Sequence, residues 1–401
     1  MNSWRAGTEF VEQSFILGCL THCLYPDRPL PAPLPGLDWD RVYGLLCWHR
    51  LTGLFYHLSK KNRDLWPQDL RERLREDRYR ALLRGDQCTK QVQALLAALD
   101  QAGIAVLVLK GWALIPTLYG GDHGQRIYGD IDLLVHPHDA ARAKDVVLGL
   151  GYQADPEPWP GFARRYRISW IYRQQPQAVE FGPAFGIGLH WGLLNTPFYF
   201  RRIAVAELFE RARPVQVAGC TALRLGAEDD LVYACGHEAL HHGYDGVLFR
   251  RYEMAAALLQ TGPGLDWDAV VARSRAWRLV LPVQRVLANL QALWPGIVPA
   301  RAAAETAALR PGHGERLVHG WLVRYRENHT ARALLAWLTM PGLGRRWRYL
   351  LEHAFPGPEY LHRRYGPPPG RLWPLLYLRH FGLAAQYGVA ALGRLSARDM
   401  P

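Results

Sequence analysis

Two stretches of the chain contain residue types at spacings that could carry chemistry. Residues 126–135 read RIYGDIDLLV and place Asp130 and Asp132 one residue apart. Residues 237–241 read HEALH and match the H-E-x-x-H pattern of zinc peptidases. Each stretch implies a different main active site, so the surrounding sequence must decide between them.

The aspartate pair predicts a cation site on a β-strand. Side chains at i and i+2 of a strand share one face, and the flanking Ile131, Leu133 and Leu134 favour a strand inside a sheet. Two neighbouring carboxylates repel each other and raise each other's pKa, so they favour a bound cation. Hard oxygen donors suit Mg²⁺, which takes further ligands from water and phosphates. The pair is therefore typical of metal-assisted phosphoryl or nucleotidyl transfer, although a lone D-x-D also occurs on solvated turns.

Upstream residues add the features of a phosphate site. Lys110 and Gly111 follow the apolar run IAVLVL at 104–109, where a buried strand meets the start of a helix. Free backbone N–H groups at a helix N-terminus attract phosphate, and glycine lets it approach the backbone. Lys110 and Arg126 are expected to contact the β- and γ-phosphates. A simple tight turn at Gly111 and a solvated Lys110 are the alternatives for each residue alone.

These residues resemble those of a known family. The segment VLKGWALIPTLYGGDHGQRIYGDIDLLVHP, with GLGY after it and LHW at 189–191, resembles the uncharacterised bacterial nucleotidyltransferases of the DNA polymerase β superfamily. The resemblance spans roughly 90–275 and implies a small mixed sheet, an NTP donor (most simply ATP) with Mg²⁺, and a helical domain after the core. The positions that it marks are Lys110, Gly111, Arg126, Asp130, Asp132 and His190.

The chain departs from the family pattern at one position. The family usually carries an acidic residue two positions before the histidine, as a third metal carboxylate, and this chain has Gly188 there. If residues 177–191 form a hairpin turning at 183–185, Glu180 falls opposite Gly188 with Cβ positions about 5 Å apart. Glu180 is then a candidate third metal ligand. A two-carboxylate site and a catalytically weak protein are the alternatives.

The HEALH stretch is weaker evidence than the aspartate pair. His237 and His241 lie one turn apart on a helix, as zinc requires, but a catalytic zinc site needs a third protein ligand. The metzincin continuation H-x-x-G-x-x-H is missing, and a chain with 16 histidines matches such a motif by chance at a real rate. We expect a structural or substrate-facing helix, with a zinc peptidase as a distant alternative. The candidates for the acceptor side of the cleft are His237, His241, His242 and Glu253.

The coarse pattern predicts an α+β fold with a small mixed β-sheet core flanked by helices. Strands are expected at 104–109 and 127–135, and in RISWIYR, QAVEF and GIGLHW, and the chain is expected to be helical from about 201. The expected regions are an N-terminal helical region (1–100, with a Pro-rich linker at 26–36), a nucleotidyltransferase core (101–200), a helical domain (201–310) and a basic aromatic helical tail (311–401).

Charge and composition favour an anionic partner. The formal net charge is +12, and the tail at 320–380 interleaves Arg with Trp and Tyr, which suits RNA or an anionic membrane surface. The alternative is a helical extension that packs its aromatic residues on the core and shows Arg to water. Six cysteines without a C-x-x-C pair, and no apolar run long enough to span a bilayer, favour a cytoplasmic protein, peripheral to the membrane at most.

Together the residues predict a nucleotidyltransferase that depends on Mg²⁺ (or Mn²⁺). Asp130 and Asp132 would hold the metal, while His190 would orient a carboxylate or the acceptor. The nucleoside monophosphate of an NTP would move to an acceptor that the sequence does not identify: a small molecule, a peptide, a protein or RNA. A catalytically degenerate nucleotide- or RNA-binding protein on the same fold is the alternative.

Overall fold

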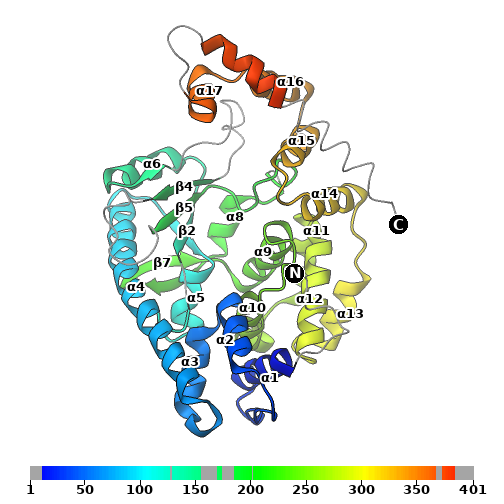
Figure 1. Ribbon diagram of the computed structural model, residues 1–401. Coiled ribbons are helices and arrows are strands. Elements are labelled where there is room, and N and C mark those ends of the chain that lie inside the picture. The colour runs from blue at the N-terminus through cyan, green and yellow to red at the C-terminus, as the bar shows by residue number, and fades with distance from the viewer. Residues whose placement is uncertain are drawn as a thin grey trace.

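The computed structural model describes residues 11–126, 129–154, 169–173, 185–200, 202–366 and 373–383. In these ranges the protein is α+β, with helices around one mixed sheet of seven strands, as the sequence predicted (Figure 1). The N-terminal region is helical and contains the non-helical Pro-rich stretch at 26–36 between its first two helices. Its helices are α1 (Val11–Leu24), α2 (Trp39–Trp48), α3 (Thr52–Lys61), η1 (Arg63–Leu65) and α4 (Gln68–Gln101).

The sheet brings together strands that are far apart in the sequence. Its order is β3-β4-β5-β2-β1-β7-β6. The central strand β2 pairs antiparallel with β1 and parallel with β5, while β7 pairs parallel with the other edge of β1. The strands are β1 (Val106–Leu109), β2 (Asp130–Val135), β3 (Gln153–Ala154), β4 (Ser169–Arg173), β5 (Gly186–His190), β6 (Arg213–Val217) and β7 (Cys220–Arg224).

Alternation along β2 gives the sheet two different faces. Ile131 and Leu133 are fully buried in an apolar cluster that includes the C-terminal half of α4 and helix α6 (Ala140–Gly149). Asp130, Asp132 and Leu134 take the opposite face, because side chains of a strand alternate. Leu134 belongs to a second apolar cluster formed largely by the helices on that side. The two aspartates therefore face the helical part of the molecule.

The connection from β1 to β2 is a short helix, α5 (Gly111–Leu118). It begins directly after Lys110, as the sequence predicted, and it contains Pro116. Its Trp112 is almost fully buried and donates a hydrogen bond from Nε1 to the backbone carbonyl of Asp130, at 3.0 Å. This bond ties the start of β2 to the start of α5, so that the aspartates and Lys110 have a fixed relation.

The region after residue 200 differs from the expectation. We expected helices from about 201, but β6 and β7 form a hairpin in this region and extend the sheet beyond the expected core boundary at 200. Of the three later strands that were expected, RISWIYR and GIGLHW contain β4 and β5, whereas QAVEF lies outside the described residues.

The remainder of the described chain is helical. The helices α9 to α12 lie on the side of the sheet opposite α4, and α16 and α17 stand at one end of the molecule (Figure 1). None of the helices among the described residues is long and apolar enough to cross a membrane. The helices are α8 (Val205–Glu210), α9 (Ala227–Leu240), α10 (Leu248–Thr261), η3 (Gly262–Gly264), α11 (Trp267–Ala276), α12 (Val280–Leu293), α13 (Ala300–Ala308), α14 (His313–Arg324), α15 (His329–Thr339), α16 (Leu343–Ala354), α17 (Pro358–Tyr365) and η4 (Trp373–Leu375).

Candidate active site

The carboxylate of Asp132 is held between two other side chains. Lys110 Nζ lies 2.9 Å from Asp132 Oδ2, and His190 Nε2 lies 2.8 Å from Asp132 Oδ1. Register explains the contacts, since Asp132 pairs with Leu109 of β1, just before Lys110, and lies beside Gly188 of β5, two residues before His190. Burial disfavours the charged carboxylate, but Lys110 and His190 outweigh it and hold the pKa of Asp132 well below its usual range.

Asp130 is the freer of the two carboxylates. Its side chain is exposed to a pocket, and no other described residue pairs with it. Partial removal from water inside the pocket, followed by repulsion from Asp132, raises the pKa of Asp130. This is the electrostatic situation in which a bound cation is favourable.

Lys110 adopts a backbone conformation that side chains rarely take. Its φ is 55° and its ψ is −133°, a combination that favours glycine. Burial lowers the pKa of its ammonium, but Tyr233 and Asp132 more than compensate, so the pKa of Lys110 is raised and the group stays charged. The sharp turn thus directs a permanent cation at the aspartates.

The space over Gly111 is filled by Arg126. A Cβ at position 111 would lie 2.2 Å from Arg126 Nη1, so this glycine makes room for the guanidinium of Arg126 beside the start of α5. Arg126 Nε lies 2.5 Å from Glu253 Oε1, and Tyr119 donates a hydrogen bond to the same oxygen at 3.0 Å. Both charged side chains are largely buried. The carboxylate of Glu253, which also lines the pocket, is therefore paired with Arg126 and Tyr119.

One face of α9 forms the wall of the pocket opposite the aspartates. Asp230, Tyr233, His237 and His241 follow one another at helical spacing and all line a cavity of about 300 Å³ that also contains Asp130, Asp132, Lys110 and Arg126. The two stretches that competed in the sequence thus line the same pocket. Burial raises the pKa of Asp230 to about 6 and that of Tyr233 to about 12.

The HEALH stretch does not have the arrangement of a zinc peptidase. Glu238, which would be the general base, is buried and accepts a hydrogen bond from Arg250 Nε at 2.7 Å. His237 and His241 instead form a cluster with His242, which follows directly at the end of α9. Burial lowers the pKa of all three histidines, that of His242 to about 2, so the rings are neutral.

The pairing expected between Glu180 and Gly188 is not found. Gly188 has Ile171 of β4 as its antiparallel partner and Asp132 of β2 as its parallel partner, so both sides of β5 are occupied at this position. A Cβ at position 188 would lie 2.4 Å from Asp132 Oδ1 and 3.0 Å from His190 Nε2. In this arrangement the Asp132 carboxylate and the His190 ring together take the space of a side chain at 188, while Glu180 itself lies outside the described residues.

Several residues of the pocket were missed in the sequence. Asp230 and Tyr233 precede His237 at helical spacing, and this periodicity could have indicated them. Arg50 and Arg224 also line the pocket, from the turn between α2 and α3 and from the end of β7. Nothing in the sequence distinguishes these two from the many other arginines, because only the fold brings them beside the aspartates.

The donor set fits a hard divalent cation. Asp130 and Asp132 present carboxylate oxygens from one face of β2, and the freer Asp130 opens onto the pocket. Oxygen ligands of this kind suit Mg²⁺, which keeps water and phosphate in its remaining positions. Asp130 and Asp132 are the residues that would hold the ion.

Comparisons with solved structures give two distant likenesses. One is to the antibiotic-resistance factor ANT(2'')-Ia, with a TM-score of 0.32 and 15% identity over 51% of this chain and 98% of that chain. The other is to an antigenic nucleotidyltransferase-like protein from Paracoccidioides brasiliensis, with a TM-score of 0.33 and 16% identity over 56% of this chain and 95% of that chain. At these scores neither likeness bears on the substrate. No curated protein matches the chain.

A sequence family gives the stronger result. The family described as "Uncharacterised nucleotidyltransferase" matches residues 35–295, which is more than half of the chain. The matched range contains β1, β2 and β5 with the aspartate pair, and also α9 and α10, which complete the pocket. The chain is therefore a member of this uncharacterised nucleotidyltransferase family.

Proposed function

We propose that the protein transfers a nucleoside monophosphate from an NTP, most simply ATP, to an acceptor, with Mg²⁺ held by Asp130 and Asp132. The observation that carries this proposal is the pocket itself. It combines two carboxylates on one strand face with the half-buried cation of Lys110 and the helix start that follows it. Such a site joins a metal position to a phosphate position, as nucleotidyl transfer requires.

The positive side chains of the pocket would bind the triphosphate. Lys110, Arg50 and Arg224 line it, and no described carboxylate forms an ion pair with Arg50 or Arg224. Bound Mg²⁺ would neutralise charge on the phosphates. Lys110 must then divide its charge between Asp132 and the donor, and His190 keeps the Asp132 carboxylate oriented meanwhile.

Asp230 is the group that we assign to the acceptor proton. An acceptor oxygen attacks the α-phosphorus, the bond from that phosphorus to the pyrophosphate oxygen breaks, and pyrophosphate leaves. The proton of the acceptor must go to a base within the pocket. Asp230 projects from α9 into the pocket, and a carboxylate with a pKa of about 6 is well matched to take a proton near neutral pH.

Gly188 favours a second candidate function. With Asp132 and His190 taking the space of a side chain at 188, this position supplies no third metal carboxylate. A protein that binds the nucleotide without transferring it would have no need of a metal carboxylate at position 188.

The test is nucleotide turnover by the purified chain. Each NTP is added with Mg²⁺, and binding is recorded by thermal shift for the wild type and for Asp130→Asn/Asp132→Asn. Pyrophosphate release is then recorded for both with a cell extract added as the source of the acceptor. We expect binding with release, and a loss of release of more than about 100-fold in the variant, because metal-based charge stabilisation contributes several kcal/mol. The surface variant Asp86→Asn/Asp268→Asn is the matched control and should behave as the wild type.

The alternatives predict other results. Binding without release, for the wild type and the variant alike, would favour the non-catalytic nucleotide-binding protein. Absence of binding by any NTP would remove the nucleotide from the proposal.

For the C-terminal region we propose an anionic membrane surface as partner in preference to RNA. Leu343, Trp347 and Leu351 repeat every four residues along α16 and are each more than half exposed in the described part of the chain. Arg346 and Arg348 lie on either side of this stripe in the helical projection. A continuous apolar stripe with arginine flanks suits a lipid interface, whereas RNA would require separated aromatic rings for stacking.

A further inference from the structure

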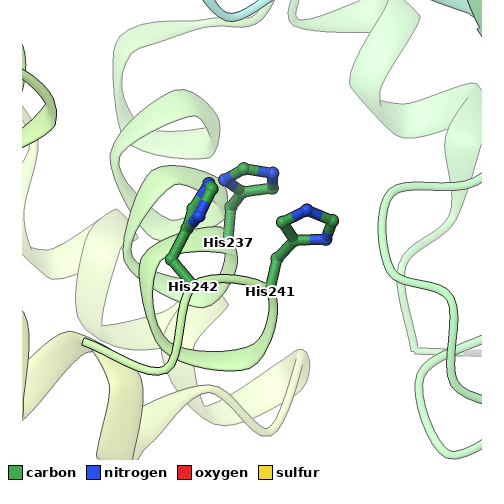
Figure 2. A group of neighbouring side chains, drawn as sticks. All are labelled: His237, His241 and His242. Atoms are coloured by element: carbon green, nitrogen blue, oxygen red, sulfur yellow. The ribbon is translucent and has the colours of Figure 1, made fainter. Parts of the chain in front are cut away.

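The end of α9 carries a cluster of three histidines that nucleotidyl transfer does not use. His237, His241 and His242 each offer a ring nitrogen, and these atoms all lie within 4.8 Å of one another. The three imidazoles project to the same side of the helix end (Figure 2). All three side chains line the pocket that contains Asp130 and Asp132.

The composition of this cluster fits a transition metal rather than Mg²⁺. Imidazole nitrogen is a preferred ligand of Zn²⁺, and three histidines with a fourth open position are a known catalytic zinc set. Magnesium prefers oxygen, so the aspartate pair and the histidine cluster would select different ions. A tetrahedral site with Zn–N bonds of 2.0–2.1 Å needs nitrogens roughly 3.4 Å apart. Side-chain rotation, chiefly of the exposed His241, has to close the remaining distance of at most about 1.4 Å.

The backbone that carries these ligands is fixed from several sides. Both His241 and His242 donate their backbone N–H to the carbonyl of His237, and Tyr244 donates to that of Glu238. Gly243 and Tyr244 have φ values of 60° and 57°, and this left-handed conformation is unfavourable for a tyrosine. A chain that keeps this turn must stabilise it by contacts elsewhere.

Those contacts come from neighbouring elements. The hydroxyl of Tyr244 lies 2.8 Å from His319 Nε2, and Arg326 donates a hydrogen bond to the carbonyl of His242. Asp245 Oδ2 lies 3.7 Å from His242 Nδ1, which leaves Nε2 of that ring for a metal. A carboxylate behind a metal-binding histidine is a common way of orienting the ring.

We propose that His237, His241 and His242 form a Zn²⁺ site whose open coordination position faces the pocket and receives the oxygen or sulfur of the acceptor. The metal site stands independently of the nucleotide. Its role toward the acceptor rests on the proposed nucleotidyl transfer. The donor nucleotide would lie at the aspartates of β2, and the acceptor would enter along α9 on the other side of the same pocket.

The experiment is a metal titration of the full chain after removal of metals by a chelator. Zn²⁺ binding is measured by calorimetry and metal content, and Co²⁺ serves as a spectroscopic substitute. We expect one Zn²⁺ per chain and the visible absorption of tetrahedral Co²⁺. The variants His241→Ala and His242→Ala should each weaken binding by at least about 100-fold, since loss of an outer-shell partner alone costs 10–100-fold.

Two control variants make the result specific. His136→Ala/His138→Ala removes another pair of histidines, whose rings stack at 5.2 Å, and should leave Zn²⁺ binding unchanged. Asp130→Asn/Asp132→Asn should also retain it, because the aspartates belong to the other metal position. Azide, a small anionic probe, should change the Co²⁺ spectrum if the fourth position is open.

Each contrary result has a definite meaning. Absence of stoichiometric Zn²⁺ binding, or binding that survives in both histidine variants, would overturn the site. Binding with no response to azide would overturn the open position, and with it the role toward the acceptor. Zn²⁺ binding in a protein that turns over no nucleotide would refute the proposed function and leave the metal site standing. Nucleotide turnover without Zn²⁺ binding would refute the metal site and leave the proposed function standing.

Discussion

Lys110 combines a strained backbone with a half-buried charge at the centre of the site. Its φ of 55° belongs to a region where glycine is favoured, yet a lysine is retained and forms an ion pair with Asp132. Strain of this kind costs about 1–3 kcal/mol and persists where the surrounding structure requires it. The charge, rather than the turn alone, explains the presence of lysine.

Two substitutions separate the strain from the charge. Lys110→Ala and Lys110→Gly both remove the ammonium and should abolish pyrophosphate release alike. The glycine variant should be more stable than the alanine variant by about 1 kcal/mol, because only glycine relaxes at positive φ. Chemical unfolding measures the difference. At Lys144, inside α6, the alanine variant should instead be the more stable of the two, because alanine favours a helix over glycine. If Lys110→Ala is as stable as Lys110→Gly, the backbone at 110 is not strained.

Asp230 links pH to both activity and stability. Its pKa of about 6 in the folded protein exceeds its ordinary value, so the folded state binds this proton more tightly than the unfolded state does. The difference in pKa makes the free energy of unfolding depend on pH. This free energy falls as pH rises from about 4 to about 6, and above that range the full decrease has taken place. As the base of the reaction it must be ionised, so pyrophosphate release should fall below about pH 6.

Asp230→Asn should therefore be less active and more stable. We expect pyrophosphate release to decrease by about 10²–10⁴-fold, and the free energy of unfolding at pH 7 to rise by on the order of 2–3 kcal/mol. Both are measured against pH. The neighbouring Asp229→Asn is the matched control and should be destabilised, because buried Asp229 pairs with Arg211 at 2.9 Å and with Arg273 at 2.6 Å. Undiminished release by Asp230→Asn would exclude it as the base.

Residues that act through local spacing could be predicted from the sequence, and residues that act through distant partners could not. The shared face of Asp130 and Asp132, and the turn at Lys110, follow from a strand and from the helix after it. The pairing of Arg126 with Glu253 joins residues separated by 127 positions, so no local pattern indicates it. The space that Gly188 provides for His190 likewise depends on the side-chain arrangement around Asp132.

At the scale of elements, α9 forms one wall of the pocket and β2 the other. The helix carries Asp230, Tyr233 and His237 on one face, opposite the aspartates of the strand. The sequence already placed HEALH on a helix, but it could not show that this helix packs across from β2. The question of which stretch forms the site therefore has a structural answer: both contribute to one pocket, from two elements.

The elements that the sequence missed are short and weakly marked. Each strand of the β6–β7 hairpin has five residues, and β6 is the edge strand, where Pro214 is tolerated. Its turn uses Ala218 and Gly219, both at positive φ, without the Asn-Gly or Asp-Gly signal that marks many such hairpins. The helix of 34 residues at α4 was easy to predict, because apolar periodicity accumulates with length.

At the scale of the whole molecule, the pocket beside the aspartates and the C-terminal helices are separate surfaces. The pocket lies between the sheet and α9, while α16 and α17 stand at one end of the structure (Figure 1). The net charge of +12 attracts the chain to anionic surfaces in general. The apolar stripe of α16 adds a local feature that a lipid interface would bury.

Vesicle binding tests the use of this stripe. We expect the chain to bind anionic vesicles roughly 30-fold more tightly than neutral ones, since Arg346 and Arg348 each contribute about 1 kcal/mol near a charged membrane. Trp347→Ser/Leu351→Ser should weaken binding by at least about 10-fold, because it removes apolar area from the interface. Sedimentation with vesicles of neutral lipid, with or without anionic lipid, gives both values.

The matched control for this stripe lies on other helices. Leu83→Ser/Leu317→Ser changes two leucines that are also more than half exposed, on α4 and α14, and should leave vesicle binding unchanged. Equal binding to neutral and anionic vesicles would contradict the role of the arginines. Binding of single-stranded RNA without binding of either vesicle would assign the surface to nucleic acid. Since the stripe lies outside the pocket, pyrophosphate release in solution should be the same for Trp347→Ser/Leu351→Ser and the wild type, which separates membrane attachment from catalysis.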